Sequence, residues 1–302
     1  MITSVALAGY AALVGAAMPP LLSQAKWPHR APVMAVLAWQ GLMVTFVVAT
    51  ALTVYHLVLT ERHAHEGLLG LLSVCGLAAD APVSESAPTL GDILALGALA
   101  VIVLLPLGWF GRCTWRARRA RQRHLDMLAL VGEPALGYDA TVVDHGAPAV
   151  YCLPGRRRRV VITRGALDVL SDAQMRAVLE HERAHIEGRH HLLHLLVDAF
   201  SRAFPGLPLA RHAKEQIALL VEMIADDRAL RSHSRDALAT AMCEVAAGQA
   251  PQGSLEVGGP GALVRLRRVL APQPRPHRVT WLSVVVASTV APLLPLLVAC
   301  GP

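Results

Sequence analysis

The chain has 302 residues, of which 54% are hydrophobic and only 17% are charged. Soluble domains carry about 25% charged residues, so this composition excludes an ordinary soluble protein and predicts membrane-spanning helices. The formal net charge of +6 comes mostly from arginines, many of which flank the apolar stretches. Arginines in such positions anchor a topology and contact headgroups, so we expect the lipid bilayer, and no direct nucleic acid, as their partner.

Four stretches of the chain are nearly free of charge and approach or exceed the roughly 20 residues needed to cross a bilayer. They cover residues 2–22, 32–60, 93–111 and 279–299. The first lacks the basic start and the cleavage site of a signal peptide, so we expect an uncleaved anchor. The apolar run 67–79 is too short to span, and it is expected to be amphipathic, re-entrant or packed as a loop.

The placement of lysine and arginine predicts the orientation of these spans. Six arginines follow the third span within residues 112–123, and Lys26 and Arg30 lie in the turn after the first. The loop 61–92 is rich in acids and carries a single arginine. We therefore predict a multi-pass protein of the cell membrane with both termini outside and the region 112–278 in the cytosol.

Three short segments at the start of this cytosolic region have the composition of β-strands, namely residues 138–144, 149–153 and 159–163. A helix is expected next, over residues 163–170. The segment 149–152 is our candidate for the edge of a small sheet, where an extended peptide substrate could add as a further strand.

A zinc-binding motif follows on a predicted helix. Ser171 and Gln174 form a capping box that marks the start of this helix. His181 and His185 are four residues apart on one helical face, so both imidazoles can reach a single metal ion. Glu182 is then placed to act as general base towards a water molecule activated by the metal.

A catalytic zinc site needs a third protein ligand and leaves one position open. One candidate is Glu222 on a predicted helix over residues 209–231, where Asp226 lies one turn later and could hold a ligand histidine. The alternative is His191, because the spacing His-Glu-x-x-His-x-x-Gly-x-x-His matches metzincins, in which the glycine ends the helix. The apolar residues that follow Gly188 favour a helix that continues through it and turns His191 away, so Glu222 is preferred.

Two more helices are expected, over residues 235–247 and 263–270, with the Gly/Pro-rich stretch 250–261 between them. His233 or Arg265 could stabilise an oxyanion, and the sequence does not choose between them. The five cysteines show no paired spacing, so no cysteine-based metal site is expected.

Taken together, these residues resemble the BlaR/MecR antirepressor family of integral-membrane zinc metallopeptidases, and more distantly the HtpX-like and CAAX-processing proteases. The resemblance rests on Leu153-Pro154-Gly155, Thr163-x-Gly165-Ala166-Leu167, residues 179–185, Arg189-His190-His191 and Glu222-x-x-x-Asp226. It implies a gluzincin-type peptidase with one Zn²⁺ per chain, bound by His181, His185 and Glu222, with Glu182 as the catalytic residue. Only Gly301 and Pro302 follow the last span, so we expect a short form without the penicillin-binding sensor domain.

We therefore expect a mostly α-helical membrane protein with four transmembrane helices. A cytosolic α+β metallopeptidase domain, made of a small sheet plus the zinc helix, is inserted between the third and fourth spans. The predicted divisions are residues 1–111 for the first three spans, 112–278 for the peptidase, and 279–302 for the last span and the C-terminus.

The predicted function is that of a zinc-dependent metalloendopeptidase acting on a protein substrate. The resemblance implies a regulatory role, in which the enzyme cleaves a cytosolic, BlaI-like transcriptional repressor in a signalling pathway. One alternative is membrane-protein quality control, as in HtpX-like enzymes. An alternative of another class is a non-catalytic membrane receptor with a structural zinc. Structural zinc sites are usually closed and rich in cysteine, however, and Glu182 would have no role in one.

Overall fold

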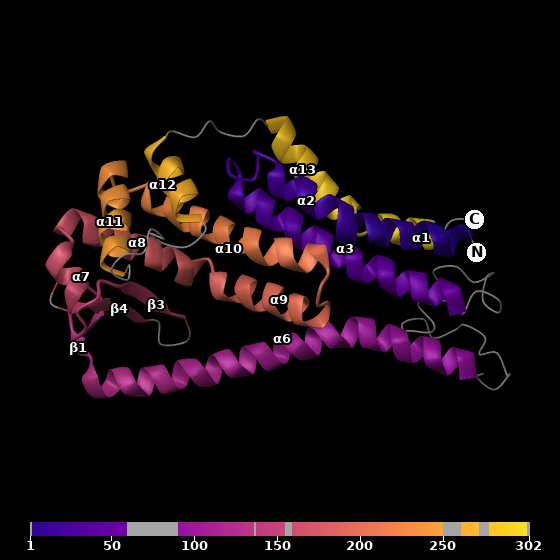
Figure 1. The fold of residues 1–302 in the computed structure, drawn as a ribbon, viewed down its shortest axis with the longest axis horizontal. Helices are drawn as coiled ribbons and strands as arrows, with labels where there is room; N and C mark the ends of the chain where they lie inside the picture. Colours follow the sequence, from indigo (N-terminus) through magenta and orange to yellow (C-terminus); the bar gives the residue numbers. More distant parts are fainter. Residues whose placement is uncertain are drawn as a thin grey trace.

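A computed structural model of the chain describes residues 2–58, 90–135, 137–154, 159–249, 261–271 and 278–300. Most of these residues are helical, and the longest helices run along the long axis of the molecule (Figure 1). The expected loop at 67–79 and most of the stretch 250–261 lie outside the described residues.

The first two predicted spans are helical. The N-terminal one consists of α1 (Ile2–Ala12), a π-helical turn (Leu13–Ala17) and α2 (Met18–Gln24), and the second is α3 (Pro32–Val58). Residues 2–24 and 32–57 are both long and apolar enough to cross a membrane. Many of their exposed side chains are apolar, as expected for helices that face lipid, because no water is available there to form hydrogen bonds with polar groups.

The third predicted span and the basic segment after it form one helix, α6 (Leu90–Val131). Its 42 residues extend about 63 Å at 1.5 Å per residue, which is about twice the thickness of a bilayer's hydrocarbon core. The basic half of α6 therefore continues beyond the apolar half and leads to the sheet (Figure 1).

The fourth predicted span is divided into two helices, α13 (Arg278–Val290) and α14 (Leu294–Cys300), by a turn around Pro292. Neither is long enough by itself to cross a membrane, so the described residues hold three candidate spans, and the fourth stays a prediction. Both helices pack on α3, and the hydroxyl of Tyr10 in α1 donates to the carbonyl of Ala291 in the turn.

The predicted strands form a small mixed sheet together with a short additional strand. The strands are β1 (Glu133–Pro134), β2 (Thr141–Val143), β3 (Val150–Leu153) and β4 (Arg159–Thr163). Their order is β1-β2-β4-β3; β2 and β4 are parallel and the other two pairs are antiparallel. β3 therefore lies at an edge of the sheet, which confirms the prediction for residues 149–152.

Both predicted helix starts after the sheet are confirmed. Helix α7 (Arg164–Val169) is capped by the hydroxyl of Thr163. Helix α8 (Asp172–Glu187) begins with the predicted capping box, in which Ser171 and Gln174 bond reciprocally to each other's backbone N–H groups. These caps satisfy donors that have no partner within a helix.

The prediction that the zinc helix continues through Gly188 is wrong. Helix α8 ends at Glu187, and α9 (His190–Ala203) begins after Arg189, whose φ of 49° is left-handed. A Cβ at Gly188 would lie only 2.5 Å from Nε2 of His190 and 3.0 Å from the carbonyl oxygen of Ala184. The chain can therefore fold back at this point because residue 188 has no side chain.

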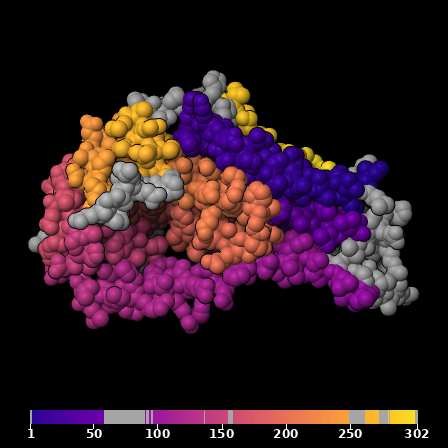
Figure 2. All heavy atoms as spheres, in the orientation of Figure 1, coloured from indigo at the N-terminus to yellow at the C-terminus, as the bar shows by residue number. Residues whose placement is uncertain are grey.

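The last helices of the region are α10 (Pro208–Ala229), α11 (Arg235–Gln249) and α12 (Ala262–Leu270). Figure 2 shows α9 and α10 filling the middle of the molecule, between the N-terminal helices and the sheet. Residues of α9 and α10 share one buried core with α3, built around Trp39, Phe200 and Ile217. A second core joins the sheet to α8 and α11. Since α10 touches both α3 and α8, it holds α8 in a fixed position relative to the membrane helices.

Candidate metal centre

Two histidines of α8 and one glutamate of α10 form a group that could hold a metal ion. The Nε2 atoms of His181 and His185 lie 3.1 Å apart. Oxygens of Glu222 lie 3.5 Å from Nε2 of His181 and 3.4 Å from Nε2 of His185. Zinc bonds of about 2.0–2.1 Å in a tetrahedron separate ligand atoms by about 3.3 Å, so the three side chains fit one zinc ion with a fourth position open.

The two helices that carry these side chains are held together by an arginine. Arg228 of α10 donates through Nε to Glu180 at 3.1 Å and through Nη2 to Glu187 at 2.9 Å, and both glutamates belong to α8. The motif histidines lie on the same helix between these two contacts. The pairing therefore fixes the register of α8 against α10, which decides whether Glu222 meets the histidines.

Asp226 lies one turn after Glu222 and contacts the first histidine, where the sequence placed it. Its Oδ1 is 3.0 Å from Nδ1 of His181, and the carboxylate is almost completely buried. A carboxylate in this position keeps the ring oriented with Nε2 towards the metal.

Arg265 of α12 contacts both carboxylates of α10. Its Nη1 lies 2.7 Å from Glu222, and its Nη2 and Nε donate to Asp226 at 2.8 and 2.9 Å. Of the two residues proposed for an oxyanion, this one reaches the cluster, whereas His233 has no ion pair or hydrogen bond to it among the described residues. Because Arg265 uses three of its N–H groups on carboxylates, we interpret it as the residue that holds Glu222 and Asp226 in place.

The charges of the cluster shift the pKa values of its members in opposite directions. Burial acts to lower the pKa of His181, but hydrogen bonds and charges from Asp226 and Glu222 outweigh it and raise that pKa to about 9. Burial acts to raise the pKa values of Glu222 and Asp226, yet their contacts with His181 and Arg265 lower both to about 2. The carboxylates of Glu222 and Asp226 therefore stabilise a positive charge beside His181. A metal cation bound there would supply such a charge.

Glu182, the predicted general base, is partly buried and lies near β3. Burial raises the pKa of its carboxyl group, while its contacts with His181 and Cys152 act to lower it. Burial and the charge of Glu182 together raise the pKa of the Cys152 thiol to about 12, so this thiol stays protonated. Cys152 belongs to the edge strand, so the predicted base and the predicted substrate-binding edge lie next to each other.

His190 also touches the cluster, a contact that was not predicted from the sequence. Its Nδ1 lies 2.8 Å from Nδ1 of His185, the two rings meet edge to face, and His190 is buried. His191, the alternative third ligand, is not a member of the metal-binding group. The left-handed turn at Arg189 is what brings His190 back against α8. The run Arg189-His190-His191 belonged to the family resemblance, but His190 was not singled out there as the histidine that contacts the cluster.

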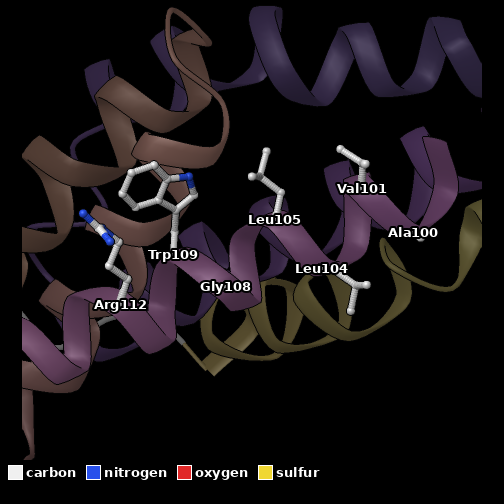
Figure 3. Close-up of a pocket in the computed structure, with 7 residues that line it drawn as sticks. All are labelled: Ala100, Val101, Leu104, Leu105, Gly108, Trp109 and Arg112. Carbon is white, nitrogen blue, oxygen red and sulfur yellow. The ribbon is translucent and has the colours of Figure 1, made fainter. Parts of the chain in front are cut away.

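A separate groove of about 450 Å³ lies on α6, and it takes no part in the metal centre. Figure 3 shows its lining residues, which are Ala100, Val101, Leu104, Leu105, Gly108, Trp109 and Arg112. Only the last of these is charged, so the groove has none of the converging polar groups that catalysis needs.

Comparison with known proteins gives one family match. Residues 114–249 match Peptidase family M48, which covers BlaR- and HtpX-like proteases, and no curated protein or solved structure matches the chain. The matched stretch contains His181, Glu182, His185 and Glu222, whereas Arg265 lies beyond it. M48 peptidases are zinc metallopeptidases. The match therefore assigns residues 114–249 to a Peptidase M48 domain, and the protein is a metallopeptidase, an enzyme that hydrolyses peptide bonds.

Proposed function

We propose that the protein is an integral-membrane, zinc-dependent endopeptidase in which His181, His185 and Glu222 hold one zinc ion per chain. The spacing of their three ligand atoms, next to the partly buried Glu182, is the observation that carries this proposal. Zinc bound there would supply Lewis-acid polarisation of the peptide carbonyl and would lower the pKa of water.

Glu182 is the general base in this proposal. Since burial raises the pKa of its carboxyl group, it binds a proton more strongly than an exposed glutamate does. It takes a proton from the attacking water and passes it to the nitrogen of the leaving amine. The contact with Cys152 limits the movement of the carboxylate between these two transfers.

The substrate in this proposal is an extended segment of a protein. β3 pairs with β4 on one side, and among the described residues its other side has no partner strand. A peptide that added to this side would run past Cys152 and therefore past Glu182. Main-chain pairing gives binding with little dependence on side chains, which is what a peptidase acting on an unfolded segment requires.

We further propose that the chain crosses the cell membrane four times, with the metal centre in the cytosol and both termini outside. Support comes from the three candidate spans and from the arginines of residues 112–123 on the extension of α6. On this topology, and given the resemblance to antirepressor peptidases, we propose a cytosolic transcriptional repressor as the substrate and a regulatory role for its cleavage.

The experiment that tests this proposal compares protein N-termini in cells that make either the wild type or Glu182→Gln, at matched levels and with zinc content measured. New cytosolic N-termini that require Glu182 would identify a protease and its substrate together, and a cut repressor would support the regulatory role. A cut confined to misfolded membrane proteins would favour quality control. Identical termini from two zinc-loaded proteins would contradict constitutive proteolysis, in which case the comparison is repeated across growth conditions.

A further inference from the structure

The groove on α6 has the shape and composition of a site for an amphiphile. Its lining residues recur at intervals of four along one side of the helix, and the only charged one, Arg112, is at the cytosolic end of the predicted span. Gly108 has no atom within 4 Å of where a Cβ would lie, so the groove stays open at that level. Val101, Leu105 and Trp109 point from the same side of α6 in Figure 3. The body of the groove is thus apolar, and its end is cationic.

Two guanidinium groups from different helices approach the same tryptophan ring, at the end of the groove. The Cζ atoms of Arg112 and of Arg202, which belongs to α9, lie 5.9 and 5.7 Å from the centre of the Trp109 ring. Neither arginine has a carboxylate within ion-pair distance among the described residues. Two like charges near one ring, without a carboxylate to balance them, favour the approach of an anion to this end of the groove. Tryptophan and arginine are also typical of the level where a bilayer meets water.

We propose that this groove binds one anionic phospholipid, with an acyl chain along Val101, Leu105 and Gly108 and the phosphate at the end where Arg112 and Arg202 both approach Trp109. The groove has room for an acyl chain. Charge favours an anionic headgroup over a zwitterionic one, because a zwitterion brings a second positive charge to the arginines. The lipid would link α6 to α9, the helix that begins at His190 beside the metal centre. This inference goes beyond the peptidase activity and does not depend on it.

The test is native mass spectrometry of the full-length protein, purified in mild detergent and mixed with phosphatidylglycerol or phosphatidylcholine. We expect one phosphatidylglycerol per chain in the wild type and roughly 25-fold weaker retention in the double variant Arg112→Gln/Arg202→Gln, since each arginine favours an anionic surface by about fivefold. The matched control is Arg118→Gln/Arg123→Gln, which removes the same charge from exposed positions on the same helix and should retain the lipid.

A second variant tests the apolar part of the groove. Gly108→Leu fills the groove without touching either arginine, and it should fold because the position has open space. We expect this variant to lose phosphatidylglycerol. Free glycerol phosphate should bind neither the wild type nor this variant. Equal retention by the arginine variant and its control, equal affinity for the two lipids, or a second copy of the chain in place of the lipid would each overturn the proposal. The Glu182→Gln variant should bind lipid like the wild type, which separates this result from the fate of the proposed function.

Discussion

The candidate membrane helices and the candidate metal centre differ in how their buried polar groups are hydrogen-bonded. In α3, the hydroxyls of Thr45, Thr50 and Thr53 each donate to the carbonyl four residues earlier in the same helix, at 2.7 Å. In the metal centre, buried polar side chains bond between α8, α10 and α12, through Asp226, Arg265 and the ligands themselves. The threonine hydroxyls of α3 are thus hydrogen-bonded within one helix, whereas the metal centre forms only when α8, α10 and α12 are in register. A substitution in the metal centre should therefore disturb residues on neighbouring helices, whereas a substitution in α3 should affect only that helix.

The largest effect is expected from Glu222→Ala. Replacing a residue that hydrogen-bonds to a metal ligand typically weakens metal binding 10- to 100-fold, and loss of a ligand itself should weaken zinc binding by more than that. It also leaves Arg265 without one of its partners. Zinc content after dialysis against a graded chelator measures the change.

Glu215→Ala is the matched control, because it removes an exposed glutamate from the same helix. Its zinc affinity should equal that of the wild type. Wild-type affinity in Glu222→Ala would contradict the assignment of the third ligand, and affinity lost in His191→Ala would point to the alternative.

His190→Ala should weaken zinc binding by about 10-fold, the low end for groups that orient a ligand. When Nε2 of His185 faces the metal, its ring proton must be on Nδ1, and the nearest acceptor is Nδ1 of His190 at 2.8 Å. Burial, the main cause, lowers the pKa of His190 to about 4, so the ring is neutral at pH 7 and can accept.

Asn can place its side-chain oxygen near the position of Nδ1, so His190→Asn should recover most of the affinity. His194→Ala provides a control on the same helix. The absorption spectrum of the cobalt-substituted protein gives a second measurement, since it reports how the ligands are arranged. Equal loss in the Ala and Asn variants would mean that His190 only fills space.

Much of this site could be predicted from local spacing, and the rest depends on tertiary packing. His181 and His185 share a face of any helix, and the pair Glu222 and Asp226 does the same, so both sets could be found without a structure. The helix end at Gly188 could not, because leucines continue beyond it and the break is stabilised by His190 packing on His185. Nor could the pairing of Arg265 with Asp226, since the two are 39 residues apart and meet only when α12 docks on α10.

The pH dependence of zinc binding is expected to be about tenfold per pH unit. The pKa of His181 is raised to about 9, so at pH 7 this ring carries a proton that zinc must displace. The pKa of His185 is lowered to about 4, chiefly by burial, so that ring is already neutral. Affinity should therefore rise with pH between 7 and 9 and then level off.

Calorimetry in buffers with different ionisation enthalpies counts the protons, and about one should be released per zinc at pH 7. Asp226→Asn removes a contact that raises the pKa of His181, so it should release a smaller fraction of a proton. Release that is the same in both proteins would show that the proton comes from another group.

The smallest effect extends the comparison to the sheet, through one substitution made at two sites: a threonine whose hydroxyl bonds within its own helix, and one whose hydroxyl bonds between elements. In Thr45→Val the lost hydroxyl bonded only to Gly41 of its own helix, so we expect a change in unfolding free energy below about 1 kcal/mol. In Thr163→Val the lost hydroxyl accepts from Ala149 at 2.8 Å and caps α7, so about 1–2 kcal/mol should be lost. Denaturant unfolding of the detergent-solubilised protein measures both. Equal losses would mean that hydrogen bonds between elements contribute no more to the unfolding free energy than hydrogen bonds within a helix. The two kinds of hydrogen bond would then differ in geometry alone.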